Sequence, residues 1–268
     1  MFELTGFADE ISPSLLEQLL VLQEEGVKYL EFRSVDQTNV GDLSNDQVRE
    51  VKKMLDDYGI GVSAIGSPIG KSPINEDFAP CVEKAKRVID IAHTLDARYI
   101  RMFSFFIPEG EAPATYRAEV IDRLGRLTEL LAGTDLVFVH ENDRGLYGDI
   151  GERCLDILQA VDSDQFRACF DPGNAVMLGA NRGYADYQLV KDYLVYFHVK
   201  DAVYSLQQFV PVGEGDGELE NILTDLANNK WQGFLSVEPH LGPYMPEAAG
   251  AERFRTALAA LRQVLSTL

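Results

Sequence analysis

The sequence lacks long apolar runs and has few cysteines, and both absences limit the class of protein. No apolar stretch approaches the roughly 18 residues of a membrane-spanning helix, and the opening MFELTGFADE has no basic segment followed by an apolar run. We therefore expect a cytoplasmic protein that does not bind a membrane. The three cysteines, Cys81, Cys154 and Cys169, show no CxxC spacing, so neither a disulfide framework nor a thiolate zinc site is expected.

Basic residues are scarce relative to acidic ones. The chain has 24 Lys and Arg residues against 43 Asp and Glu residues, for a formal net charge of −19. A negative field repels phosphate backbones and anionic headgroups, so we expect no nucleic acid among the partners, although a local basic pocket could hold one phosphate group. Hydrophobic residues make up 46% of the chain, which is typical of a soluble protein with a sizeable core.

Periodicity along the chain predicts eight strands that alternate with helices. Short β-branched or aromatic runs predict strands at residues 3–7, 29–33, 61–65, 99–103, 135–140, 166–170, 195–199 and 233–237. Apolar residues at helical spacing predict helices that include residues 15–22 and 48–55, and further helices at 79–95, 118–132, 154–161, 189–193, 219–228 and 252–265. Ser44 and Gln47 fit a capping box, and Gly26 and Gly59 fit helix ends.

The order of these elements indicates the fold class. Eight strands each followed by a helix, with no Pro/Gly/Ser-rich linker, indicate an α/β protein in which residues 1–268 form one (β/α)8 TIM-barrel domain. The alternative is a doubly wound open sheet. That fold usually has fewer strands, and the first βα turn here lacks the GxGxxG phosphate loop, so we favour the barrel.

Four successive predicted strands end in a residue that can bind metal or carry protons. LVFVHEN ends in Glu141, RACFDPGN in Asp171, YFHVKD in His198 and FLSVEPH in Glu238. The four recur at intervals of roughly 30 residues, the length of one βα unit, and period-2 alternation places each on the inward face of its strand. In a barrel of this kind, chemistry takes place where the strands end.

The residue types point to a divalent metal. Taken singly, a buried His is commonly a packed core residue, and a carboxylate at a strand end is commonly a helix cap or a solvated charge. Four such residues on adjacent strand ends rarely arise by chance, so we expect a joint site. Three carboxylates and one imidazole suit one ion of Mn²⁺, Mg²⁺, Co²⁺ or Zn²⁺, with coordination positions left for water or substrate.

Several segments also resemble a known family. GVKYLEFRSVD, GVSAIGSPIGK, VHEN, FDPGN, FHVKD, VGEGDG and SVEPH, spread over nearly the whole chain, resemble the xylose isomerase-like sugar phosphate isomerase/epimerase superfamily, which also includes the endonuclease IV fold. The resemblance implies a TIM barrel in which Glu141, Asp171, His198 and Glu238 bind one divalent metal. It also implies a carbohydrate isomerase or epimerase.

Two positions depart from the pattern of the D-tagatose 3-epimerase-like members. Those proteins carry a His three residues after the metal-binding Asp, where this chain has Asn174. They also carry an Arg six residues after the metal-binding His, where this chain has Tyr204. Both departures count against ketohexose epimerase specificity, and neither affects the expected metal ligands.

The residues and the resemblance together predict proton transfer on a small carbohydrate. Removal of a proton next to a carbonyl gives an enediolate, whose charge a divalent cation stabilises as a Lewis acid. Glu141 and Glu238 are the expected acid and base, and a purely metal-binding role for them is the alternative. Epimerisation, aldose–ketose isomerisation and dehydration all remain open, and so does the oligomeric state, including a homo-oligomer.

Polar residues near the same strand ends are expected to bind the substrate. Lys200 follows His198 by two residues on the same face, and His240 follows Glu238 in the same way. For Lys200, an ion pair with a neighbouring carboxylate is the alternative. The expected substrate-binding residues are Ser67, Lys71, Asn174, Lys200, His240 and, as the lesser prediction, Arg33. For Arg33 we favour an internal ion pair with Glu31, which is in phase with it.

Two rival functions are less favoured. A phosphodiesterase of the endonuclease IV type needs additional His and carboxylate ligands and a basic surface, whereas this chain has four histidines and a charge of −19. A catalytically silent sugar-binding or scaffold protein would be expected to lose at least one ligand, and all four are present.

Overall fold

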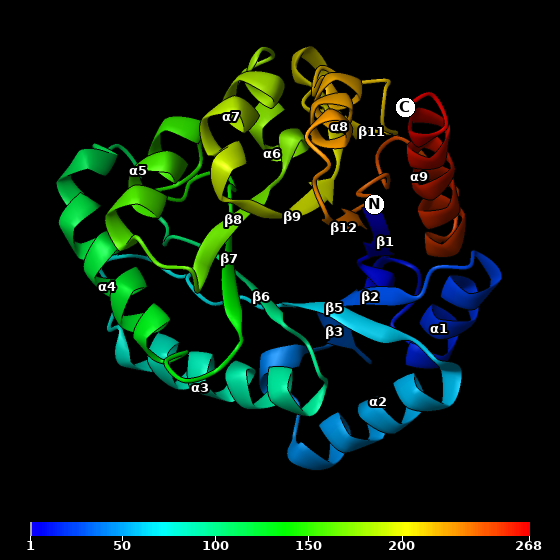
Figure 1. Cartoon of the computed structure of the whole chain (residues 1–268), viewed down its shortest axis with the longest axis horizontal. Coiled ribbons are helices and arrows are strands. Elements are labelled where there is room, and N and C mark those ends of the chain that lie inside the picture. Colours follow the sequence, from blue (N-terminus) through cyan, green and yellow to red (C-terminus); the bar gives the residue numbers. More distant parts are fainter. Residues whose placement is uncertain (1) are drawn as a thin grey trace.

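Eight parallel strands line the centre of the molecule and helices surround them (Figure 1). The computed structural model describes residues 2–268. The barrel strands are β1 (Phe2–Gly6), β2 (Tyr29–Phe32), β5 (Gly61–Gly66), β6 (Tyr99–Met102), β7 (Val137–Glu141), β8 (Phe166–Phe170), β9 (Leu194–Val199) and β12 (Gly233–Val237). They pair in the order β1-β12-β9-β8-β7-β6-β5-β2.

The sheet closes between its first two strands. A parallel bridge joins Phe7, just after β1, to Glu31 on β2, and brings the two ends of the sheet together. The predicted (β/α)8 barrel is therefore confirmed, and the open doubly wound sheet is wrong. Each strand lies within two residues of its predicted bounds, because short apolar runs between polar turns mark buried parallel strands clearly.

The helices form the outer layer of the barrel. They are α1 (Leu15–Glu24), α2 (Asn45–Tyr58), α3 (Ala79–Thr94), α4 (Arg117–Glu129), α5 (Gly151–Val161), α6 (Pro172–Val176), α7 (Arg182–Val190), α8 (Leu219–Asn228) and α9 (Gly250–Leu265). No helix within residues 2–268 is both long and apolar enough to cross a membrane.

Helix α2 shows how local sequence sets these bounds. Ser44 caps its first turn, and Gln47 completes the predicted capping box by accepting from the backbone of Ser44. The buried residues Val48, Val51 and Leu55 recur on one face, as an amphipathic helix requires. Gly59 ends the helix at φ 65°, a left-handed conformation that glycine adopts without strain.

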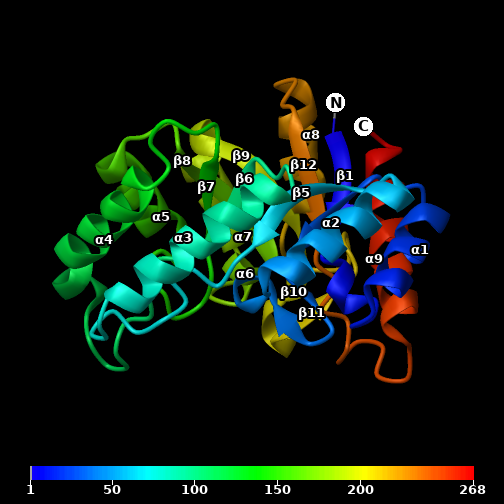
Figure 2. The same ribbon diagram turned by 90° about the horizontal axis from the view of Figure 1, so that it is seen from below.

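Two predictions about the connecting segments need correction. The helix predicted at 189–193 is α7, which begins earlier at Arg182 and is followed by a 3-10 turn, Lys191–Tyr193. The sequence also did not predict two short hairpins, β3 (Ser34–Val35) with β4 (Thr38–Asn39) and β10 (Asp201–Val203) with β11 (Gln208–Val210). Figure 2 shows β10 and β11 at the end of the barrel opposite the N-terminus, beyond the carboxyl ends of the strands.

The strands separate two apolar regions. Outward-facing residues such as Phe138 and Phe197 pack in the large cluster between strands and helices. A smaller cluster, which comprises Ala64, Val137, Val139, Cys169 and Tyr196, fills the inside of the barrel. Glu141 and His198 follow members of this inner cluster at period 2 on the same strands. The inside of the barrel is therefore apolar at depth and polar toward the carboxyl ends of the strands.

The VGEGDG segment has a structural role. The carboxylate of Asp201 accepts hydrogen bonds from the backbone N–H groups of Gly213, Gly215 and Gly217. A Cβ atom at Gly215 would lie 2.3 Å from Asp201 Oδ1, so no larger residue fits without displacement. The glycines thus fold this loop around a buried carboxylate, next to the strand end that carries His198.

Candidate metal centre

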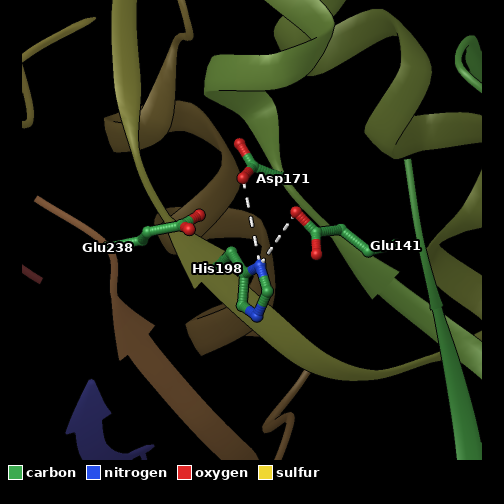
Figure 3. A group of neighbouring side chains, drawn as sticks. All are labelled: Glu141, Asp171, His198 and Glu238. Carbon is green, nitrogen blue, oxygen red and sulfur yellow. Dashed lines mark ion pairs between the residues drawn. The ribbon is translucent and has the colours of Figure 1, made fainter. Parts of the chain in front are cut away.

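Four side chains from the carboxyl ends of β7, β8, β9 and β12 converge inside the mouth of the barrel (Figure 3). Glu141, Asp171, His198 and Glu238 each offer one ligand atom, and these atoms all lie within 4.8 Å of one another. All four residues are buried. The structure therefore brings together the residues that strand-end position and spacing singled out.

His198 is oriented by Glu31, a carboxylate that is not one of the four candidate ligands. Its Nε2 lies 3.1 Å from Glu31 Oε2, and the same oxygen accepts a hydrogen bond from Ser236 Oγ at 2.7 Å. With Nε2 directed to Glu31, Nδ1 faces Glu141 Oε1 at 3.4 Å and Asp171 Oδ2 at 3.9 Å. Burial would lower the pKa of His198, but Cys169 first and then Glu31 and Glu141 raise it well above its usual value.

Asp171 is held by its backbone and by one of its two carboxylate oxygens. Asn142 brackets the backbone, donating from Nδ2 to the carbonyl of Asp171 and accepting from its N–H, both at 2.8 Å. Oδ1 accepts from the N–H of Asn174 at 2.9 Å and caps α6. Burial raises the pKa of Asp171 to about 7, with Glu141 and Glu238 adding to the shift and Lys200 opposing it.

The ligand atoms that the four residues offer fit a divalent cation. Within residues 2–268, His198 Nδ1 is buried without a hydrogen-bond partner, and Asp171 Oδ2 makes no hydrogen bond of normal geometry beside its ion pair with Lys200 at 2.7 Å. An unpartnered buried polar atom is costly, and His198 Nδ1 belongs to the cluster of candidate ligands. Three carboxylates, an imidazole nitrogen and a carboxylate behind the imidazole form a set that binds borderline or hard divalent ions.

Glu141 lies against a buried arginine on the neighbouring strand. Arg101 Nη1 donates to Glu141 Oε2 at 2.7 Å, and Asn174 Nδ2 donates to Oε1 at 3.0 Å. Burial would raise the pKa of Glu141, but the charges of His198 and Arg101 outweigh it and hold the pKa well below its usual range. The carboxylate is therefore ionised at neutral pH.

Glu238 has three cationic neighbours. Its Oε1 lies 3.1 Å from both Arg33 Nη1 and His240 Nε2, and its Oε2 accepts from Lys200 Nζ at 2.6 Å. Burial would raise the pKa of Glu238, but Lys200 first and then His240 lower it well below its usual value. The pKa of His240 is raised to about 9, because Glu238 and Glu10 outweigh the effect of burial.

A cavity of about 360 Å³ opens above these residues. Glu141 and Glu238 line it, and so do all the residues expected to bind substrate, namely Arg33, Ser67, Lys71, Asn174, Lys200 and His240. Lys71 Nζ lies 2.8 Å from Asp143 Oδ2 and 4.4 Å from the centre of the Phe103 ring. The cavity is therefore polar and carries both signs of charge.

All six expected substrate-binding residues already have polar partners in the protein, and those of Ser67 and Lys200 bear on their expected roles. The hydroxyl of Ser67 donates to the carbonyl of Arg101 at 2.5 Å and accepts from the N–H of Ile69, so it shapes the loop and has no free donor for a ligand. Lys200 forms the ion pairs that were its alternative, with Asp171 at 2.7 Å and Glu238 at 2.6 Å.

The predicted ion pair between Arg33 and Glu31 is wrong. Arg33 contacts Asp9 at 2.8 Å, Glu10 at 3.3 Å and Glu238 at 3.1 Å. Glu31 instead faces His198. The two residues are in phase, but Glu31 lies within β2 and deeper in the barrel, where His198 and Ser236 reach it. Arg33 follows β2 and lies at the rim, next to the acidic residues that follow β1.

Among the residues that the sequence analysis missed are Arg101, Arg144 and Asn142. Arg101 lies near the end of β6 in phase with Tyr99, which is close to the strand-end signal that identified the ligands. Arg144 lines the cavity from the exposed loop after β7, and no periodicity marks a loop residue. Asn142 follows Glu141 in the chain, and its side chain hydrogen-bonds to the backbone of Asp171 on the next strand end. Sequence pattern does not reveal such a contact between strands.

The chain belongs to the xylose isomerase-like TIM barrel family, whose model matches residues 19–264. This confirms the resemblance stated from the sequence. Comparison with curated protein sequences gave no match. The chain and the solved IOLI protein, described with a binding zinc atom, align over 99% of each chain with a TM-score of 0.83 and 16% identity.

Two other solved structures align over nearly the whole chain. A D-tagatose 3-epimerase-like protein covers 99% of each chain with a TM-score of 0.78 and 19% identity. The probable 3-DHS dehydratase AsbF from Bacillus anthracis covers 95% of this chain and 97% of its own, with a TM-score of 0.73 and 16% identity. At these identities, the likenesses concern the fold alone.

Proposed function

We propose that this chain is a divalent-metal-dependent isomerase or epimerase that moves a proton next to the carbonyl of a small sugar, sugar phosphate or cyclitol through an enediolate. The observation that carries the proposal is the convergence of Glu141, Asp171, His198 and Glu238 beneath a polar cavity. The family membership and the solved epimerase-like and zinc-bound relatives support it. The cofactor would be one ion of Mn²⁺, Mg²⁺, Co²⁺ or Zn²⁺.

In the proposal, two of the four residues also act as acid and base. When bound, a divalent cation would supply Lewis-acid stabilisation of the charge that develops on the substrate oxygens. Glu141 and Glu238 lie on opposite sides of His198, and both line the cavity (Figure 3). In the proposal one of the two, as the carboxylate, removes the proton from the substrate carbon. The other, as the protonated acid, delivers a proton to the opposite face for epimerisation or to the adjacent carbon for isomerisation.

The remaining cavity residues would position the substrate. Both Nδ2 hydrogens of Asn174 are donated to Glu141 and Asn142, so Asn174 would offer its Oδ1 as an acceptor to a substrate hydroxyl group. His240 lies beside Glu238 and suits a substrate hydroxyl group. Lys71 and Arg144 stand at the loops around the cavity, and Arg144 makes no ion pair with any residue from 2 to 268. This pair of cations would hold an anionic end of the substrate, such as a phosphate group.

Dehydration is the second candidate, and the fold similarity to the probable dehydratase AsbF favours it. Removal of a proton next to the carbonyl is the shared first event. Loss of a hydroxyl from the adjacent carbon then gives an unsaturated ketone, with the second carboxylate delivering a proton to the departing oxygen. The product, not the first step, separates the two candidates.

Exchange of a carbon-bound proton with D₂O reports the shared step. The metal-loaded protein would be incubated with a panel of ketoses, inososes and sugar phosphates, and followed by NMR. We expect one class of compound to exchange. For it, Glu141→Gln and Glu238→Gln should each lower the exchange rate at least about 100-fold, while Glu109→Gln, an exposed control, leaves it unchanged. Full exchange in both active-site variants would reject the assignment.

A further inference from the structure

We infer that Lys200 is a built-in competitor of the metal: its ammonium group and the divalent cation use the same carboxylate oxygens. This inference rests on the proposed metal centre. Lys200 follows β9 and points to the same side as His198. Its Nζ lies 2.7 Å from Asp171 Oδ2 and 2.6 Å from Glu238 Oε2, so it joins two of the four candidate ligands.

The hydrogen bonds of the two carboxylates explain why the competition is direct. Oδ1 of Asp171 caps α6 through the N–H of Asn174, so Oδ2 is the oxygen left for a cation. Oε1 of Glu238 is shared by Arg33 and His240, so Oε2 is the oxygen left there. Lys200 contacts these two remaining oxygens. A divalent ion held by Asp171 and Glu238 would have to take them from the ammonium group or share them with it.

The surroundings keep Lys200 in this position. The side chain is buried, and its stem passes over Gly173, where an added Cβ would lie 2.8 Å from Lys200 Cγ. Phe209 on β11 covers the ammonium group, with Nζ 5.1 Å from the centre of the ring. The absence of a side chain at position 173 therefore makes room for the lysine, and the β10–β11 hairpin shields it from solvent.

Because the site is buried, the positive charge of Lys200 affects both the stability of the metal-free site and its affinity for metal. Three carboxylates lie within the same small cluster, and without a cation they would repel one another in a poorly solvated site. Lys200 neutralises part of this charge and so keeps the centre formed before an ion binds. The same positive charge opposes a divalent ion at close range, which lowers metal affinity. The protein thus exchanges some metal affinity for a stable metal-free site.

The test compares metal affinity in full-length, metal-stripped wild-type protein and Lys200→Met by calorimetric titration with Mn²⁺. We expect Lys200→Met to bind Mn²⁺ at least tenfold more tightly than wild type. Lys200→Arg, which retains the charge, should stay close to wild type. Lys86→Met removes an exposed lysine of α3 whose partner, Glu83, is not a candidate ligand, and should leave the affinity unchanged.

Thermal unfolding gives a second measurement. Metal-free Lys200→Met should melt below wild type, and saturating Mn²⁺ should raise its Tm by more than it raises that of wild type. Should the variant fold only with metal present, loss of Mn²⁺ to increasing chelator concentrations replaces the calorimetric titration. Equal or weaker Mn²⁺ binding by Lys200→Met overturns the inference while the metal centre stands. Failure of wild type to bind Mn²⁺ overturns the centre itself.

Discussion

His198 and Glu31 contact each other inside the barrel, with His198 Nε2 3.1 Å from Glu31 Oε2, although 167 residues separate them in the chain. A carboxylate behind a metal-binding imidazole fixes the ring and leaves the other nitrogen for the ion. We predict that Glu31→Gln weakens metal affinity by about 10- to 100-fold. Metal titration measures it, with the exposed Glu3→Gln as control. Unchanged affinity would show that Glu31 does not orient the ring.

Arg101 is predicted to act as a positioning residue for Glu141. Its charge helps to lower the pKa of that carboxylate, so Arg101→Met should raise the pKa of Glu141. More of the carboxylate is then protonated at mildly acidic pH, and the acidic limb of the kcat/KM profile should move to higher pH. The exposed Arg98→Met is the control. An acidic limb at the wild-type position would argue against this role.

Two glycine substitutions test the loop that encloses Asp201. Gly215→Ala should destabilise the protein by about 1–3 kcal/mol, because the new Cβ would lie 2.3 Å from Asp201 Oδ1 and 2.5 Å from the carbonyl of Ala202. Gly125→Ala, inside α4 with no atom within 4 Å of the added Cβ, should be neutral or stabilising by up to about 1 kcal/mol. Urea unfolding measures both. Equal stability of the two variants would contradict the packing described for the loop.

The cations at the cavity mouth predict a preference for an anionic substrate. Arg144→Ala should raise KM for a phosphorylated substrate by about tenfold and leave kcat nearly unchanged, because the contact is made equally in the ground state and the transition state. KM for the unphosphorylated analogue should not change. If KM rises equally for both compounds, or for neither, Arg144 does not bind the anionic group.

The strands and the four candidate ligands could be predicted because both depend on short-range pattern. Period-2 alternation and the end of each apolar run place Glu141 and Glu238 without knowledge of their neighbours. Contacts between strands could not be predicted in this way. Arg33 and Glu31 share a face, but their partners come from β9, β12 and the segment after β1, so the sequence paired them with each other wrongly.

Helix α7 shows a second limit. Its early part contains Gly183, which suggests a loop, yet the glycine is required because an added Cβ would lie 2.3 Å from the carbonyl of Gly217 in the VGEGDG segment. The close packing of two distant segments therefore requires glycine at position 183, where a better helix former would clash. Short hairpins such as β10–β11 likewise depend on contacts with other segments, here Phe209 against Lys200 and Asp201 with the glycines of the VGEGDG segment.

The central claim is that four strand-end side chains hold one divalent ion, and anomalous scattering from a crystal soaked in Mn²⁺ tests it most directly. We predict one strong peak bound by Glu141, Asp171, His198 and Glu238, absent from crystals of Asp171→Asn soaked in the same way. A map without density between these residues, or with the ion bound elsewhere, would contradict the account.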